Sequence, residues 1–376
     1  MRHAIATLLL LAPAPPIAAD MLADDRADVM YHRYDGGGVT VDGPSLLVRK
    51  KFAEQYAVTA GYYLDMVSSA SIDVVTTASP YSEERSEYGL GFEYLRGKTT
   101  YDLGFSSSKE DDYEANTARF SISQDMFSDL TTVSLSFARG WDKVYRQGDE
   151  AFGEKADRRV YGIDISQIAT RRLIVGLSWD TVTEEGYLNS PYRSVRYLDP
   201  ASASGYSYEP ERYPGTRTGS AVALRARYNF PYRFALHGEY RYYADDWDIR
   251  AHTLEVGYTH GFADRWIVEA RYRYHTQEGA DFYSDLFPRS NFQDYLARDK
   301  ELSTMSSQTF GFGLSYEFAA PWLRFLERSS VNLKYDVIRY DYDDFRDLRY
   351  TGLEAGDEPL YFFDANVVQL YFSGWF

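Results

Sequence analysis

The chain has 376 residues, a formal net charge of −16, 35 tyrosines, 22 phenylalanines and no cysteine. The acidic balance argues against nucleic acid as a partner, and the lack of cysteine excludes disulfides, thiol chemistry, c-type haem attachment and lipidation at an N-terminal cysteine. No stretch approaches the roughly 18 consecutive apolar residues that a membrane helix needs. Helical membrane proteins are therefore excluded.

The N-terminal segment predicts export. Residues 1–3 are a basic start, residues 4–12 are a short apolar run, and small residues end at Ala19. This order is that of a secretory signal peptide, which is too short to span a bilayer. We expect residues 1–19 to be removed and residues 20–376 to form a single domain, because no linker or composition shift divides them.

Short segments in which apolar and polar residues alternate follow one another along the whole mature chain. In a strand such alternation gives one apolar face and one polar face. The segments are about as long as strands that cross a bilayer at a tilt. The expected strands are residues 24–34, 45–52, 56–65, 86–95, 99–108, 113–124, 131–141, 158–168, 172–183, 222–230, 234–243, 253–259, 266–275, 308–318, 330–340 and 366–376.

The connections between these strands alternate in length. Tight ones lie near Gln55, Gly97, Thr170, Tyr232 and Ala263. Longer ones are expected at residues 66–85, 142–157, 184–218, 276–306 and 342–364. A separate connection, residues 319–329, is expected to form one helical turn. Short turns at one end and long loops at the other are typical of outer-membrane barrels. We therefore predict an all-β, antiparallel up-and-down transmembrane β-barrel of about 16 strands, with short periplasmic turns and long extracellular loops.

The stretch from Ser220 to His275 shows the alternation most clearly and carries charge on its inner face. A hairpin turning on Tyr232 places Arg225 opposite Glu239 and Arg227 opposite His237. A second hairpin, turning on Asp264, places Glu255 opposite Arg273 and Glu269 opposite Thr259. The predicted lumen-lining charge network is Arg225, Arg227, His237, Glu239, Arg241, Glu255, Glu269, Arg271, Arg273 and His275.

Two interpretations of this network stay open. Opposite charges across a strand pair stabilise by roughly 0.2–1 kcal/mol, so the network can serve as a brace that rigidifies the wall. Alternatively, the five arginines form a basic stripe that attracts an anionic or redox-active guest into a pore.

The final strand predicts assembly into a membrane. Its outward face carries Val368, Leu370, Phe372 and Phe376. An alternating last strand that ends in phenylalanine resembles the signal by which the outer-membrane assembly machinery recognises its clients. A closed wall also requires this strand to pair with the first one.

No enzyme motif is present in the sequence. A nucleophile elbow, a phosphate loop, a zinc-protease helix and an EF-hand loop are all missing. The five histidines that follow the signal peptide lie on separate segments. A lipid-modifying enzyme that assembles Ser, His and an acid from different strands stays a third possibility. Acidic runs such as residues 110–112 and 341–347 are expected to be solvated loops, with cations or lipopolysaccharide as alternative ligands.

Several unusual stretches resemble a bacterial family known as domain of unknown function 3570. They are residues 34–44, 66–84, 190–200, 235–240 and 297–303. The resemblance covers essentially the whole mature chain and implies an outer-membrane barrel of Gram-negative bacteria. It also implies envelope redox work, because genes of this family often neighbour those for flavin transfer and for thioredoxin-like proteins. The family offers no catalytic residues.

The expected function follows from these points. We expect a pore or sheath that passes a small solute or houses a periplasmic redox partner, without catalytic activity and without a cofactor or a metal. The alternative is a closed structural or adhesion barrel that acts through its extracellular loops. Expected partners are the outer-membrane bilayer, lipopolysaccharide and the assembly machinery.

Overall fold

The wall of the molecule is a single sheet that closes on itself. The computed structural model describes residues 21–69, 81–319 and 325–376. Its barrel has 16 antiparallel strands, and β1 (Arg26–Gly36) pairs with β18 (Leu360–Trp375) to complete the circle. Closure pairs the backbone groups that lipid could not satisfy. The predicted fold class is therefore confirmed, whereas the predicted signal peptide lies outside the described residues.

Apart from the closing pair of β1 and β18, neighbours in the barrel are also neighbours in sequence, except that β9 is followed by β12. A separate small sheet consists of β10 (Ser194–Leu198) and β11 (Tyr206–Pro210). The other barrel strands are β2 (Val39–Phe52), β3 (Tyr56–Ser69), β4 (Tyr81–Arg96), β5 (Thr99–Lys109), β6 (Tyr113–Met126), β7 (Thr131–Arg146), β8 (Asp149–Ile168), β9 (Leu173–Gly186), β12 (Thr216–Asn229), β13 (Phe234–Asp245), β14 (Arg250–Phe262), β15 (Trp266–Gln277), β16 (Met305–Phe318) and β17 (Arg328–Arg346).

Helical structure is limited to two short 3₁₀ turns, η1 (Pro231–Arg233) and η2 (Lys300–Leu302), in the described ranges. No helix among these residues is long and apolar enough to cross a membrane.

Alternation along each strand separates an apolar outer face from a polar inner face. On β12, Val222 and Leu224 are 45% and 59% exposed, whereas the inward Ala221 and Ala223 are 4% and 3% exposed. Large apolar side chains that point outward would be unfavourable in water, but lipid covers them in a membrane. The outer face is thus the lipid-facing one.

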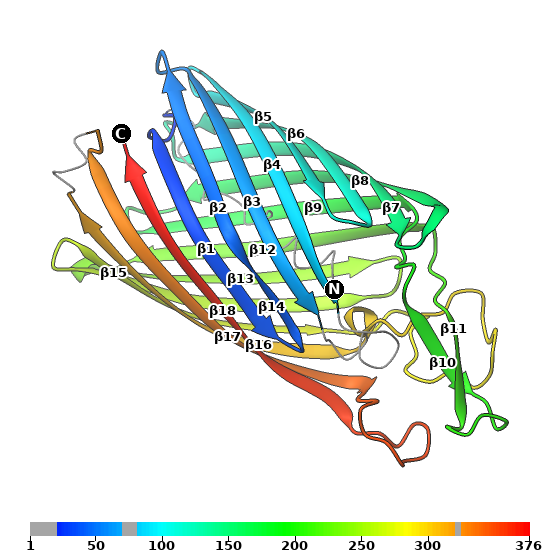
Figure 1. Cartoon of the computed structure of the whole chain (residues 1–376). Helices are drawn as coiled ribbons and strands as arrows, with labels where there is room; N and C mark the ends of the chain where they lie inside the picture. The colour runs from blue at the N-terminus through cyan, green and yellow to red at the C-terminus, as the bar shows by residue number, and fades with distance from the viewer. Residues whose placement is uncertain (1–20, 70–80, 320–324) are drawn as a thin grey trace.

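The two ends of the barrel differ (Figure 1). At one end, here called the turn end, short turns such as 53–55, 97–98 and 263–265 join the strands, and β18 ends there. The opposite end, here called the long-loop end, carries the segments 187–215, 278–304 and 347–359. The predicted segregation of turns and loops is present for these connections.

Some predicted loops are wrong. Residues 142–157 are a continuous hairpin, because β7 runs to Arg146 and β8 begins at Asp149. Gly148, with φ +81°, makes the tight turn between them. The alternation persists beyond Trp141, but Lys143, Lys155 and Asp157 occupy outward positions, so the apolar period that marks a membrane strand disappears.

Other boundaries are also longer than predicted. β2 begins at Val39, inside the break expected after Tyr34, and β17 extends six residues beyond the predicted end at Tyr340, to Arg346. The segment predicted as irregular at 184–218 contains β10 and β11. Of the segment 319–329, expected to contain a helical turn, residues 320–324 lie outside the described residues, and β17 begins within it at Arg328.

Cysteine labelling tests the orientation of the barrel. Cysteines introduced at Ser204 and Ser290, both at the long-loop end, are expected to react with an impermeant maleimide on intact cells. A cysteine at Thr170, in a turn-end connection, is expected to react only after the outer membrane is opened. The native chain has no cysteine, so the background is clean. The reverse labelling pattern would mean that the long loops face the periplasm.

Candidate functional site

The predicted registers of the two central hairpins are correct. Both turns use the left-handed region, with φ +68° at Tyr232 and +58° at Asp264. The inner faces of four strands are therefore aligned as expected. The paired residues are Arg225 and Glu239, Arg227 and His237, Glu255 and Arg273, and Thr259 and Glu269.

Arg225 is the best-connected lumen cation of these hairpins. Its Nε donates to Glu239 at 2.7 Å, its Nη1 to Asp164 at 3.0 Å and its Nη2 to Ser178 Oγ at 3.1 Å. These partners lie on β13, β8 and β9, so one guanidinium joins four strands. Arg225 has the geometry of a brace.

The other predicted arginines differ from it. Arg227, Arg241 and Arg273 make no ion pair with any described residue, although the guanidinium of Arg241 lies 5.9 Å from the ring centre of Tyr243. Arg227 is exposed, and the other two are partly exposed. Arg271 donates to Asp336 at 2.8 Å while its side chain stays 41% exposed. The stripe is thus largely accessible from the lumen.

The remaining predicted residues make looser contacts. His237 Nε2 lies 3.8 Å from Glu255, and Glu269 lies 4.0 Å from Lys334. His275 Nδ1 and Thr253 Oγ1 are 2.9 Å apart. Glu255 and Arg273 face each other in register but form no ion pair. The predicted residues therefore share one wall without forming a continuous network.

A tighter polar cluster on β1, β3 and β4 was missed by the sequence analysis. His32 Nε2 lies 2.7 Å from Asp65 Oδ1, and its ring stacks on Tyr63 with centroids 4.6 Å apart. Arg85 lies 3.6 Å from Asp65 and donates to Glu87 at 2.6 Å. The sequence pattern gives no sign of this contact, because Asp65 on β3 lies two strands away from His32 on β1.

Gly43 on β2 makes this contact across a strand possible. It is the register partner of His32 and leaves the space between β1 and β3 free of a side chain. A Cβ atom at this position would lie 1.8 Å from the backbone oxygen of Leu64. The glycine in the run Val41–Pro44 is therefore the one sequence signal for the cluster.

Polar contacts continue around the long-loop end of the inner wall. Arg158 donates to Glu184 at 2.7 Å, and Arg217 donates to Asp245 at 2.6 Å. The Tyr113 hydroxyl donates to Asp142. Together with the His32 cluster, these contacts form what we call the mouth belt, which spans strands from β1 to β13. Such ties between strands hold the rim in a fixed shape.

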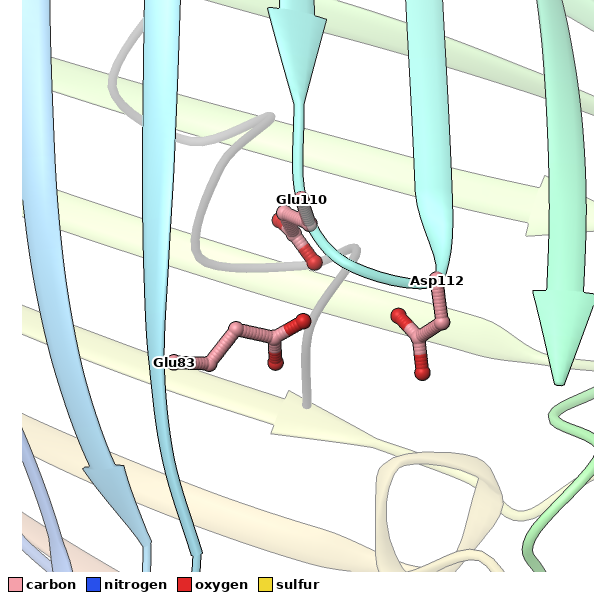
Figure 2. Close-up of side chains that lie close together, drawn as sticks. All are labelled: Glu83, Glu110 and Asp112. Carbon is pink, nitrogen blue, oxygen red and sulfur yellow. The ribbon is translucent and has the colours of Figure 1, made fainter. Parts of the chain in front are cut away.

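Three carboxylates gather at the same rim, beside the mouth belt (Figure 2). Oxygens of Glu83, Glu110 and Asp112 lie within 4.8 Å of one another. Asp112 is only 7% exposed, so the expectation of a solvated loop is wrong for this residue. Carboxylate oxygens are ligands that Ca²⁺ favours. However, Arg85 lies 3.8 Å from Glu110 and supplies positive charge itself.

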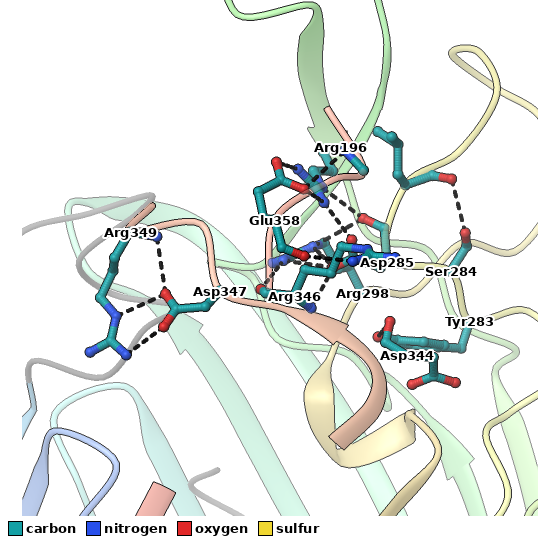
Figure 3. A network of polar contacts seen from close by, with 12 residues as sticks. Arg196, Tyr283, Ser284, Asp285, Arg298, Asp344, Arg346, Asp347, Arg349 and Glu358 are labelled. Carbon is teal, nitrogen blue, oxygen red and sulfur yellow. Dashed lines mark hydrogen bonds and ion pairs between the residues drawn. The ribbon is translucent and has the colours of Figure 1, made fainter. Parts of the chain in front are cut away.

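The long loops are folded around a buried arginine (Figure 3). Arg196 on β10 is fully buried, donates to Glu358 at 2.5 and 3.0 Å, and also pairs with Asp285. Asp285 Oδ1 also accepts from Arg298 Nε at 3.0 Å and from the backbone N–H of Arg346 at 3.1 Å. We call this assembly of segments 187–215, 278–304 and 347–359 the loop cap.

Apolar packing supports the same cap. Val195, Phe287 and Leu296 form one buried cluster, and Phe282 packs edge-on against Trp247 with centroids 5.1 Å apart in another. The cap therefore has a small core of its own. Long loops with a core and a satisfied ion network present a fixed surface.

Comparisons with solved structures show the fold of outer-membrane barrels. A bacterial polysaccharide outer membrane secretin has a TM-score of 0.51 at 9% identity, over 93% of this chain and 98% of that one. Outer-membrane expressed OmpT of Vibrio cholerae has a TM-score of 0.45 at 10% identity, over 94% of this chain and 99% of that one. The CymD monoaromatic hydrocarbon channel has a TM-score of 0.45 at 8% identity, over 95% of this chain and 90% of that one.

A search of curated proteins finds no match for this sequence. One family model does match, over residues 72–340, which is more than half of the chain. It is the family indicated by the unusual stretches of the sequence. The chain therefore belongs to the family described as "Protein of unknown function (DUF3570)".

Proposed function

We propose that this protein is a water-filled outer-membrane pore for small charged solutes. One observation supports this above the others: Arg227, Arg241 and Arg273 point into the barrel without an ion-pair partner among the described residues. An unpaired guanidinium in a dry interior would cost several kcal/mol, so these groups require water or a mobile counter-ion. A barrel of 16 strands is wide enough to hold an aqueous channel.

The lumen carries both signs of charge. Across the barrel from Arg271 and Arg273 on β15, the inner faces of β4 and β5 carry Glu87, Glu93 and Asp102. Each of these acids lies beside an arginine: Arg85, Arg49 and Arg119, respectively. In the order of 16 strands, β5 lies eight positions from β15, so these two strands face each other across the barrel. Because these acids have arginine partners, this wall presents charges of both signs to the lumen. A charged solute would therefore meet a polar path with local sites for either sign.

Two matched variants distinguish the pore from the brace. Arg227→Gln with Arg273→Gln removes unpaired charges, so it is expected to shift ion selectivity toward cations with little loss of thermal stability. Arg225→Gln removes the residue that joins four strands and is expected to lower stability by about 1 kcal/mol, since its side chain is 29% exposed and partly screened. Reversal potentials in planar bilayers and melting curves measure the two effects.

The control is Arg289→Gln, which removes a cation from a loop and should change neither quantity. Unchanged reversal potentials in the Arg227 and Arg273 double variant would contradict a role of the stripe in permeation. If no version conducts, the pore proposal fails. A closed scaffold, or a sheath for a periplasmic redox partner, would then take its place.

A further inference from the structure

The outer face of the β7–β8 hairpin carries two pairs of like charges. Arg139 is the register partner of Arg159, and Lys143 is the register partner of Lys155. All four side chains share the outward face with Leu135 and the apolar residues below it. Like charges directly across an antiparallel pair are destabilising unless something compensates them.

Nearby acids compensate only part of this charge. Asp157, between the two pairs, accepts from Arg139 at 2.7 Å and lies 3.0 Å from Arg159. Glu114 pairs with Lys143 at 3.2 Å. Lys155 is exposed and makes no ion pair with any described residue.

Glu185 on β9 is the register partner of Asp157 and adds one more acid to this outward face. Glu185 forms no ion pair with the four basic residues, so four cations share this part of the outward face with three acids. The positive charge left over, at Lys155, is balanced most directly by an anion that lies beside the hairpin.

The height of these residues matches the headgroup region. From Leu130 at the turn end to Arg139, nine residues at about 3.3 Å each and a tilt of about 40° rise roughly 23 Å, close to the thickness of an apolar barrel band. The Phe137 and Tyr161 rings, 5.3 Å apart, lie one step below Arg139 and Arg159 on the same face. Aromatic rings at this position are typical of the membrane interface.

Two other outward arginines at the long-loop end are balanced. Arg33 lies 3.2 Å from Asp42 and 3.4 Å from Asp35. Arg339 lies 3.0 Å from Asp341 and 3.4 Å from Asp364. Each of these arginines has two acids to itself, so a surplus of positive charge distinguishes the β7–β8 hairpin from these sites.

We propose that Arg139, Lys143, Lys155 and Arg159 bind the phosphate groups of lipopolysaccharide. Guanidinium groups match phosphate oxygens in geometry, and ammonium groups add point charge beside them. The site faces lipid, at the end where outer-membrane barrels place their long loops, which favours a phosphorylated lipid of the outer leaflet. This inference does not depend on the pore.

The experiment compares Lys155→Gln/Arg159→Gln with the wild type and with Arg171→Gln/Arg172→Gln at the turn end. The first variant removes one member of each like-charged pair and leaves the Arg139–Asp157 and Lys143–Glu114 pairs intact. Heat-modifiability in detergent is measured alone and with bisphosphorylated lipid A, phosphatidylglycerol, phosphatidylethanolamine or inorganic phosphate. Lipid A binding is measured by native mass spectrometry.

Without lipid, the Lys155 and Arg159 variant is expected to melt at or above the wild-type temperature. Lipid A should raise the melting temperature of the wild type and of the turn-end control, and should bind the Lys155 and Arg159 variant at least tenfold more weakly. Equal binding by all three proteins would overturn the proposal. So would an equal effect of phosphatidylglycerol or inorganic phosphate on the wild type. If the double variant does not fold, Lys155→Gln alone serves the same comparison.

Discussion

Deletion of Phe372–Phe376 is expected to abolish heat-modifiable, membrane-integrated protein. Phe372 pairs with Val29 on β1 and with Val331 on β17, and Trp375 pairs with Arg26 and Arg328 on the same strands. Losing these residues leaves backbone groups of both neighbouring strands unpaired at lipid depth, where each costs several kcal/mol. The barrel then has an open edge in the membrane.

A deletion of equal length in the loop cap, residues 353–357, is the matched control and should leave the barrel intact. Outer-membrane fractions, probed by electrophoresis with and without heating, give the yield of folded protein. The same truncation also tests the assembly signal predicted at Val368, Leu370, Phe372 and Phe376, because it removes the last two of these residues. Normal membrane yield of the truncated chain would contradict both the closure argument and that signal.

The wall could be predicted because its determinants are local. A two-residue period sets which face is apolar, and a tight turn then fixes the register of the hairpin. That is why the pairing of Arg225 with Glu239 follows from the position of Tyr232. Where outward positions are charged, as at Lys143 and Lys155, the two-residue apolar period is absent. The sequence therefore predicts a loop where the structure has a hairpin.

The cap and the His32 cluster could not be predicted in this way. Arg196 and Glu358 are 162 residues apart, one on the short strand β10 and the other in the connection before β18, so no period relates them. His32 reaches Asp65 across β2, which requires knowing two registers and the space left at Gly43. Contacts of this kind depend on the tertiary arrangement, and the sequence supplies only the residues that take part.

Replacing Arg196 by methionine is expected to loosen the loop cap. The side chain is fully buried, and its removal leaves Glu358 without a cation and Asp285 with fewer donors. Breaking a buried pair from one side costs about 3–5 kcal/mol, so local opening should become roughly 100-fold more frequent or more. Hydrogen exchange of residues 194–198 and 285–298 measures this opening.

Arg349→Met is the control, because Arg349 pairs with Asp347 but its side chain is 53% exposed. It should change exchange in the cap only slightly, since exposed pairs contribute about 0–1 kcal/mol. The strands of the barrel should keep their protection in both variants. Unchanged exchange in the Arg196 variant would mean that the apolar clusters alone hold the loops.

Acid should loosen the cap by the same route. Burial is the largest single influence on Glu358 and opposes its ionisation. The hydrogen bonds and the charge of Arg196, together with backbone N–H donors, outweigh burial and hold the pKa of this carboxyl below its ordinary value of 4.5. A carboxyl with a lowered folded pKa contributes stability that is present above its ordinary pKa and is lost as the pH falls through the folded value. Cap exchange, corrected for its intrinsic rate, should therefore be constant from pH 7 to about pH 5 and rise below about pH 4.5. In the Arg196→Met protein this acid step should be much smaller, because the favourable charge pair is already gone. If exchange rises equally in both proteins at acid pH, the rise comes from protonation of other carboxylates of the cap.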